Sequence, residues 1–151
     1  MNLKPTHSPW ISKPVRRIVA LPADPKLRLT TTEQIHGLLR PIFAGLDREH
    51  LWRVDLGARS NFLGAELVSI GTVDSAPAHP REIFGTAIAV SRASKIVLAH
   101  NHPSGDSQPS DSDLRMTKRL AMCGLLLGID VVDHIIIANE KHFSFSSARL
   151  F

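Results

Sequence analysis

The sequence predicts a single α/β domain of the α+β type, in which helices flank a mixed β-sheet. A length of 151 residues suits one domain. Apolar residues make up 43% and charged residues 21%, which is typical of a globular protein. The expected elements follow one another as α, β, β, α, β, α, β, β, and this order favours a sheet covered by helices on both faces. We expect the domain to span residues 15–151, after an extended arm over residues 1–14 that contains three prolines.

The domain is expected to begin with a short edge strand and a helix. An apolar run over residues 15–21 predicts the strand. Thr30 and Glu33 match the capping box that starts a helix, and Pro41 and Gly45 are expected to end it. Apolar side chains at helical spacing form one face of this helix: Ile35, Leu38, Leu39 and Ile42.

A hairpin and a second helix follow. Two apolar segments, residues 51–56 and 62–70, flank turn residues 57–61 and predict paired strands. A loop over residues 71–80 leads to a helix expected at 82–91. The side chains on the buried face of this helix are expected to be Ile83, Ala87 and Val90.

The second half of the domain is expected to hold three strands and the longest helix. The apolar run over residues 95–99 is typical of a buried central strand, and residues 100–110 predict a polar loop. Residues 111–127 predict a helix that Gly128 ends. Its side chains available for packing are Leu114, Leu120, Met122 and Leu125. Two further strands are expected at residues 131–138 and 142–145, joined by a turn at 139–141.

Composition excludes several classes of protein. The single cysteine, Cys123, can form neither an internal disulfide nor a cysteine-based zinc finger. No apolar run is long enough to span a membrane, and the basic N-terminus lacks the apolar segment of a signal peptide, so we expect a cytoplasmic protein.

Basic residues are concentrated at the N-terminus. Residues 1–30 contain six basic residues and one acidic residue, whereas the other 121 residues contain 12 basic and 13 acidic residues. Aromatic side chains of the kind that stack on single strands do not alternate with these charges. We therefore interpret the segment first as a solvated arm and second as a contact for nucleic acid.

The polar loop after the central strand carries the most informative pattern. His100 and His102 stand two residues apart at the end of an extended segment, so both side chains point to one side and can bind the same cation. The loop then returns to a helix whose first turn contains Asp113. Two imidazoles and one carboxylate leave the fourth position of a tetrahedral zinc ion open, as in catalytic zinc sites.

The full pattern is His-x-His, seven residues, Ser, two residues, Asp, and it contains His100, His102, Ser110 and Asp113. It resembles the metal-binding signature of the JAB/MPN family, whose members include the JAMM metalloproteases.

Three longer stretches are similar to the bacterial RadC branch of that family. They cover residues 79–84, 98–105 and 133–136, and the whole resemblance extends over residues 30–145. The resemblance implies a mixed sheet between helices, similar to the cytidine deaminase architecture.

The resemblance also implies a mechanism. Zinc (Zn²⁺), held by His100, His102 and Asp113, lowers the pKa of its bound water. A glutamate takes the proton from that water and later gives it to the leaving group. Ser110 is implied to form a hydrogen bond with the water or with the tetrahedral oxyanion.

Glu49 is the first choice for the catalytic glutamate. It stands just before a strand, at a position that matches the family. Two alternatives remain open: Glu66, within the second strand of the hairpin, and Glu82, in the first turn of a helix, where a carboxylate interacts favourably with the helix dipole without any catalytic role.

Other polar residues have structural interpretations. Asp133 and His134 lie inside an apolar strand, where they either support the zinc ligands or form a buried pair satisfied by backbone groups. His79 is expected to cap a helix or to have a role in the loop, rather than to bind a metal. Asp106 and Asp111 are expected at a turn and at a helix N-cap.

Three functions are compatible with these features. The first is a zinc-dependent hydrolase, a metallopeptidase or isopeptidase acting on a peptide or protein substrate. The second is a DNA-associated factor of the RadC type with a metal-binding domain and no peptidase role. An inactive metal-binding scaffold ranks third, because all three expected ligands are present. A cytidine deaminase is excluded, since one cysteine cannot supply the Pro-Cys-x-x-Cys ligands.

Overall fold

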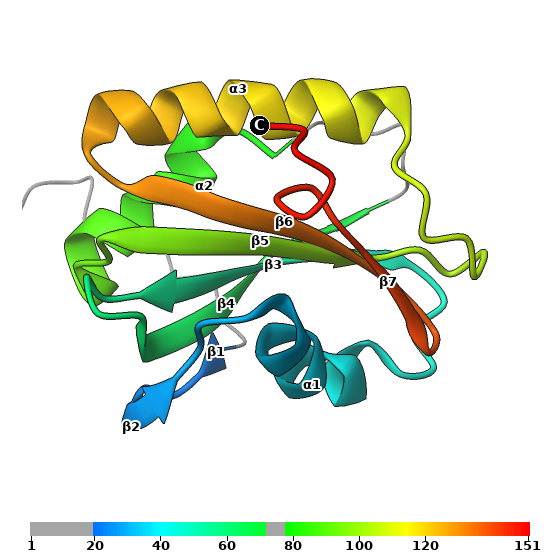
Figure 1. Cartoon of the computed structure of the whole chain (residues 1–151), viewed down its shortest axis with the longest axis horizontal. Coiled ribbons are helices and arrows are strands. Elements are labelled where there is room, and N and C mark those ends of the chain that lie inside the picture. The colour runs from blue at the N-terminus through cyan, green and yellow to red at the C-terminus, as the bar shows by residue number, and fades with distance from the viewer. Residues whose placement is uncertain (1–19, 72–77) are drawn as a thin grey trace, which may run out of the picture.

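The computed structural model describes residues 20–71 and 78–151. They form a seven-stranded mixed sheet with helices on both faces, which confirms the expected fold class (Figure 1). The strands are β1 (Ala20–Leu21), β2 (Asp24–Arg28), β3 (Glu49–Leu56), β4 (Asn61–Gly71), β5 (Lys95–Asn101), β6 (Asp130–Ala138) and β7 (Lys141–Ser144). The helices are α1 (Thr32–Phe43), α2 (Pro80–Thr86), the π-helical turn η1 (Ala87–Ser91) and α3 (Asp111–Leu127). The expected arm at residues 1–14 lies outside the described residues, as do most of the expected edge strand and residues 72–77.

The strands follow the order β1-β4-β3-β5-β6-β7, and β2 also pairs with β4. β5 and β6 are parallel, whereas the other pairs are antiparallel. Parallel neighbours need a crossover connection, and α3 supplies it over one face of the sheet (Figure 1). The end of β5 and the start of α3 therefore lie at the same edge of the sheet, joined by residues 102–110.

Helix α1 covers the opposite face, where Ile35 and Leu39 pack in one apolar cluster with Trp52 and Val54 of β3 (Figure 1). Leu38 and Ile42 are partly buried against this cluster, so the expected apolar face of the helix is confirmed. The helix ends at Phe43, between Pro41 and Gly45, where its end was expected.

The start of α1 differs by one residue from the prediction. Thr31 is the N-cap: its side chain accepts a hydrogen bond from the backbone of Gln34, and the Gln34 side chain accepts one from the backbone of Thr31. The expected pair was Thr30 and Glu33. Both pairs satisfy the capping-box pattern. The helix that is capped by Thr31 is the one in which Ile35 is buried.

The helix expected over residues 82–91 also differs from the prediction at one point. Ile83 and Ala87 are fully buried, as expected, but Val90 is 75% exposed. The expected single helix over residues 82–91 is instead α2 followed by the π-helical turn η1. A π-turn holds more residues than an α-turn, so Val90 is moved off the buried face.

Helix α3 has the expected bounds, and Gly128 ends it with a φ of 69°. Its buried residues form a narrow stripe: Asp113, Thr117, Leu120 and Gly124. Met122 and Leu125 were expected to pack but are 68% and 77% exposed. A Cβ at Gly124 would lie 2.4 Å from the carbonyl oxygen of Ile129, so this glycine allows the helix to approach the chain that follows it.

Within the described residues, no helix combines the length and the apolar character that crossing a membrane requires.

Candidate metal centre

His100 lies near the end of β5 and is buried, with 4% of its surface exposed. β5 continues through Asn101, so the expected polar loop begins two residues later than predicted. Side chains alternate along a strand, and His100 follows Leu98 onto the face beneath α3. In the sheet, His100 stands between Leu51 of β3 and Ile136 of β6.

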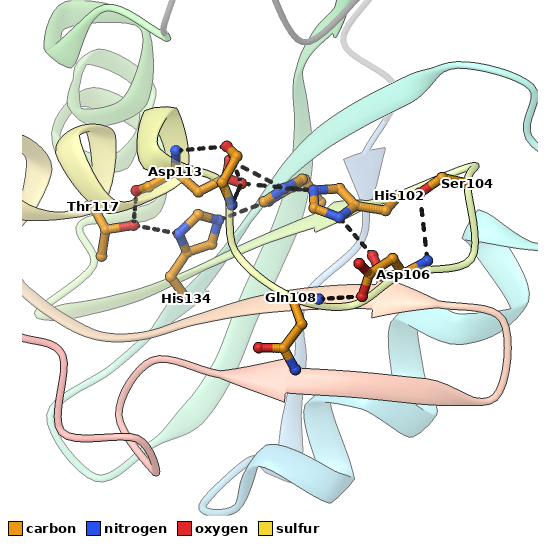
Figure 2. Close-up of polar contacts among 9 residues, drawn as sticks. His102, Ser104, Asp106, Gln108, Asp113, Thr117 and His134 are labelled. Carbon is orange, nitrogen blue, oxygen red and sulfur yellow. Dashed lines mark hydrogen bonds and ion pairs between the residues drawn. The ribbon is translucent and has the colours of Figure 1, made fainter.

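His102 follows the strand directly, and its backbone N–H donates to the carbonyl of Ile137 at 3.0 Å. Its Nδ1 lies 2.7 Å from the backbone carbonyl oxygen of Asp106 (Figure 2). A carbonyl can only accept, so Nδ1 carries the proton and neutral His102 has its lone pair at Nε2. The Asp106 side chain accepts a hydrogen bond from the backbone of Gln108 at 3.0 Å, which confirms its expected role in a turn.

Asp113 is held by a reciprocal cap at the start of α3. The Ser110 hydroxyl donates to Asp113 Oδ2 at 2.6 Å, and the Ser110 backbone N–H donates to the same oxygen at 2.8 Å. In return, the Asp113 backbone N–H donates to Ser110 Oγ at 3.1 Å. Ser110 is therefore the N-cap; the prediction that Asp111 caps this helix was wrong, since Asp111 is the first helical residue.

The three side chains meet at one point. Each offers a ligand atom, and these atoms lie within 4.8 Å of one another. The Nε2 atoms of His100 and His102 are 2.9 Å apart, and Asp113 oxygens lie 3.3 Å and 3.7 Å from them, respectively. Unprotonated ring nitrogens and a carboxylate this close together repel one another, and a proton or a metal ion among them removes the repulsion. The donor set is one that zinc accepts, so these residues fit a metal ion.

Burial and charge set the protonation of the cluster. Burial lowers the pKa of His100 to about 4. The neighbouring Asp113 carboxylate raises the pKa of His102 above its ordinary value. Burial alone would raise the pKa of Asp113, but interactions with His102, His100 and Ser110 outweigh it and hold that pKa below the ordinary range. At neutral pH, the candidate ligand His100 is therefore uncharged and the candidate ligand Asp113 is ionised.

His134 on β6 contacts the buried side of this cluster. Its Nε2 is 2.8 Å from Nδ1 of His100, and its Nδ1 is 2.6 Å from the hydroxyl oxygen of Thr117 on α3 (Figure 2). The Thr117 hydroxyl also donates to the backbone carbonyl of Asp113 at 2.6 Å. The ring of Phe145 stacks on His134 at a centroid distance of 4.8 Å.

Asp133, the neighbour of His134, points elsewhere. Its carboxylate accepts hydrogen bonds from the hydroxyls of Thr32 and Ser144 and from the backbone N–H of Ser146. The two residues of the pair therefore differ: His134 contacts the candidate ligand His100, whereas Asp133 is a buried group satisfied by hydroxyl and backbone donors.

The three candidate glutamates lie in different surroundings. Glu49 is the first residue of β3, two residues before Leu51, which pairs with His100 at the end of the β3–β5 ladder. Its charge contributes to the raised pKa of His102. Glu66 accepts hydrogen bonds from Arg53 and Thr86 in the interior, and Glu82 is exposed in the first turn of α2.

A surface pocket brings Glu49, His102 and Ser110 together. Arg48, Ser104 and a few neighbouring residues complete its lining. Among the described residues, the pocket therefore combines one metal-ligand candidate with both of the predicted catalytic side chains.

Sequence reasoning missed Thr117. The sequence does place Thr117 four residues after Asp113, and therefore on the same face of the helix. Its partner His134 lies on a distant strand, β6, which the local sequence does not indicate. The expected capping role of His79 is confirmed: its Nδ1 accepts a hydrogen bond from the backbone of Arg81 at 3.2 Å.

Comparison with known proteins shows the family of this chain. A family model described as a RadC-like JAB domain matches residues 29–150. A UPF0758 protein of Desulforamulus reducens is 44% identical over 135 residues, which cover 89% of this chain and 59% of that protein. A UPF0758 protein of Rubrobacter xylanophilus is 44% identical over 131 residues, covering 87% and 52% of the two chains. One from Methanococcoides burtonii is 38% identical over 129 residues, covering 85% and 56%. The chain thus spans somewhat more than half the length of these relatives.

Proposed function

The chain belongs to the RadC-like JAB domain family, and on this premise we propose that it is a zinc-dependent hydrolase that cleaves peptide or isopeptide bonds. The observation that carries the proposal is the meeting of His100, His102 and Asp113 beside a pocket lined by Glu49. Three ligands from the protein leave one position of a tetrahedral site open, as hydrolysis requires.

A zinc ion in this cluster would supply a Lewis acid and would lower the pKa of water near neutrality. His100 and His102 would bind it through Nε2, and Asp113 through a carboxylate oxygen. The backbone carbonyl of Asp106 orients His102, because it accepts the proton on Nδ1 and leaves Nε2 free.

Glu49 is the general base and then the general acid. Its carboxylate takes a proton from the attacking water and delivers it to the leaving amine. Two features support this role over Glu66 and Glu82: the interaction of its charge with His102 and its place in the pocket beside His102. Glu66 is bound to Arg53 and Thr86. A carboxylate held in an ion pair of this kind does not take a proton from the attacking water.

Ser110 donates to the oxyanion during the reaction. Its hydroxyl has a single proton, and that proton is now donated to Asp113. The role therefore requires the hydroxyl to rotate when substrate enters, while the backbone N–H of Ser110 keeps its hydrogen bond to Asp113.

The proposal is tested with zinc-loaded protein on a panel of peptides and isopeptide-linked substrates. Glu49→Gln should retain zinc but reduce kcat by about 10²–10⁴-fold, because it removes the proton-transfer group. Glu82→Gln is the matched control and should keep full turnover. Turnover that survives Glu49→Gln would reject Glu49 as the base, and absence of turnover on every substrate would count against the hydrolase.

Nucleic acid is the second candidate partner, on the basis of the basic N-terminal segment. If it binds DNA, replacing Lys4, Lys13, Arg16 and Arg17 together with alanine should weaken binding and flatten its salt dependence. Unchanged, salt-independent binding would reject this segment as the contact.

A further inference from the structure

A chain of hydrogen bonds extends inward from the candidate metal ligand His100. It passes from His100 Nδ1 to His134 Nε2, from His134 Nδ1 to the Thr117 hydroxyl, and from that hydroxyl to the backbone carbonyl of Asp113. The three distances are 2.8, 2.6 and 2.6 Å. All of these groups are buried, so water does not compete for them.

The direction of the protons along this chain follows from its last member. A backbone carbonyl only accepts, and an oxygen–oxygen distance of 2.6 Å is typical of a hydrogen bond, so the single hydroxyl proton of Thr117 points to Asp113. The Thr117 oxygen must then accept from His134, whose proton lies on Nδ1. The Nε2 of His134 is left as an acceptor, and it takes the proton on Nδ1 of His100.

The opposite direction is disfavoured by the same geometry. It would put the Thr117 proton on the His134 side and leave two oxygen lone pairs facing each other at 2.6 Å. It would also put the proton of His100 on Nε2, between His102 and Asp113, where a metal ion binds.

We propose that His134 and Thr117 are positioning residues that hold His100 in the tautomer with its proton on Nδ1 and its Nε2 lone pair toward His102 and Asp113. The inference deepens the proposed function, on which it rests for the identity of the metal. Asp113 serves twice in this arrangement: its carboxylate is a ligand, and its backbone carbonyl ends the chain that orients another ligand. Stacking by Phe145 keeps the His134 ring in the plane that the two hydrogen bonds require.

Thr117→Val tests the proposal, because it keeps the shape of the side chain and removes the acceptor for His134 Nδ1. We expect zinc affinity, measured by competition with a chromophoric chelator, to fall by roughly 10–100-fold. Thr117→Ser restores the hydroxyl and should restore the affinity. Thr86→Val is the matched control: it removes the hydroxyl of the last residue of α2, which contacts Arg53 and Glu66 and no ligand candidate, and it should leave zinc affinity unchanged.

The second measurement is the ring nitrogen spectrum of the zinc-loaded wild-type protein. Long-range proton–nitrogen correlations should show His100 and His134 neutral, each with its proton on Nδ1. A proton on Nε2 of either ring overturns the proposal, as does a Thr117→Val protein that folds and binds zinc as tightly as wild type. If Thr117→Val does not fold, the proposal is tested by the tautomers of His100 and His134 in the wild-type protein, by the same criterion.

Failure of the proposed function has a different signature. A protein that binds zinc with these tautomers but cleaves nothing contradicts the hydrolase and supports the positioning role. If the wild-type protein takes up no zinc, the proposed function is contradicted, and the tautomers of the metal-free protein decide the positioning role by the same criterion.

Discussion

Two buried polar clusters lie on the same side of the sheet, and they differ in whether the chain supplies its own cation. In the first, Arg53 donates all five guanidinium N–H groups: two to Asp55, one to Glu66, one to Thr86 and one to the carbonyl of Ile83. This network joins β3 and β4 to α2 and leaves no donor of Arg53 unused.

The second cluster contains His100, His102, His134 and Asp113, and it has no such cation. Within the described residues, the ion pairs of Asp113 involve only histidines, and two of the three rings have lowered pKa values. A cluster that balances its own charge stabilises the fold, whereas one that presents lone pairs and a carboxylate without a cation is suited to bind one. The difference separates a structural polar network from a candidate metal site.

The largest effect should come from removing the internal cation. Arg53→Met leaves the buried Asp55 and the partly buried Glu66 without their partner and should lower the free energy of unfolding by about 3–5 kcal/mol, as measured by urea denaturation. Zinc affinity of the folded protein should not change, because the network contacts no ligand. Arg40→Met is the matched control: the exposed pair of Arg40 and Glu140 should contribute less than about 1 kcal/mol. If Arg53→Met lost zinc without losing stability, the two clusters would not differ in the way described here.

The next effect is the pH dependence of zinc affinity. Zinc needs neutral imidazoles, and the pKa of His102 is raised above its ordinary value of 6.5 whereas that of His100 is lowered to about 4. From about pH 5 up to the pKa of His102, binding should therefore release one proton, and affinity should rise about tenfold per pH unit before it levels off.

Competition titrations at several pH values measure this slope. His142→Gln, which removes a histidine on the far side of the sheet, should leave it unchanged. A slope of two protons per zinc would show that both ligand histidines are charged in the metal-free protein.

The smallest effect on stability should come from the cap of α3. Ser110→Ala should cost about 1 kcal/mol, because it removes the side-chain acceptor for the backbone of Asp113. Thr31→Ala removes the equivalent cap of α1 and should cost a similar amount.

Only the site variant should also affect catalysis. Zinc should be retained in Ser110→Ala while turnover falls by about 10²–10³-fold, because the proposed oxyanion donor is lost. Equal turnover in the two cap variants would assign Ser110 a structural role alone.

The sequence predicted the local features of the site because they depend on short spacings. His100 and His102 stand two residues apart at the end of β5, and the bounds of α3 follow from its polar start and Gly128. The capping pair of α1 was displaced by one residue because Thr30 and Thr31 satisfy the same pattern, and the register depends on packing against the sheet.

The sequence could not locate the contacts that depend on tertiary structure. The buried stripe of α3 includes two polar residues, Asp113 and Thr117, and a glycine, so hydrophobicity favoured Met122 and Leu125 instead. The contact between Thr117 and His134 exists because the crossover from β5 to β6 lays α3 over both strands, and no local pattern records it.

The most direct test of the account is the zinc content of the folded protein and of two variants. Elemental analysis after equilibrium dialysis should find one zinc per chain in wild type and in Arg53→Met, and none in the double variant His100→Ala, His102→Ala. X-ray absorption of the wild-type protein should give Zn–N distances of about 2.0–2.1 Å. Stoichiometric zinc in the double variant would place the metal elsewhere, and a wild-type protein without zinc would contradict the assignment of the histidine cluster as a ligand site.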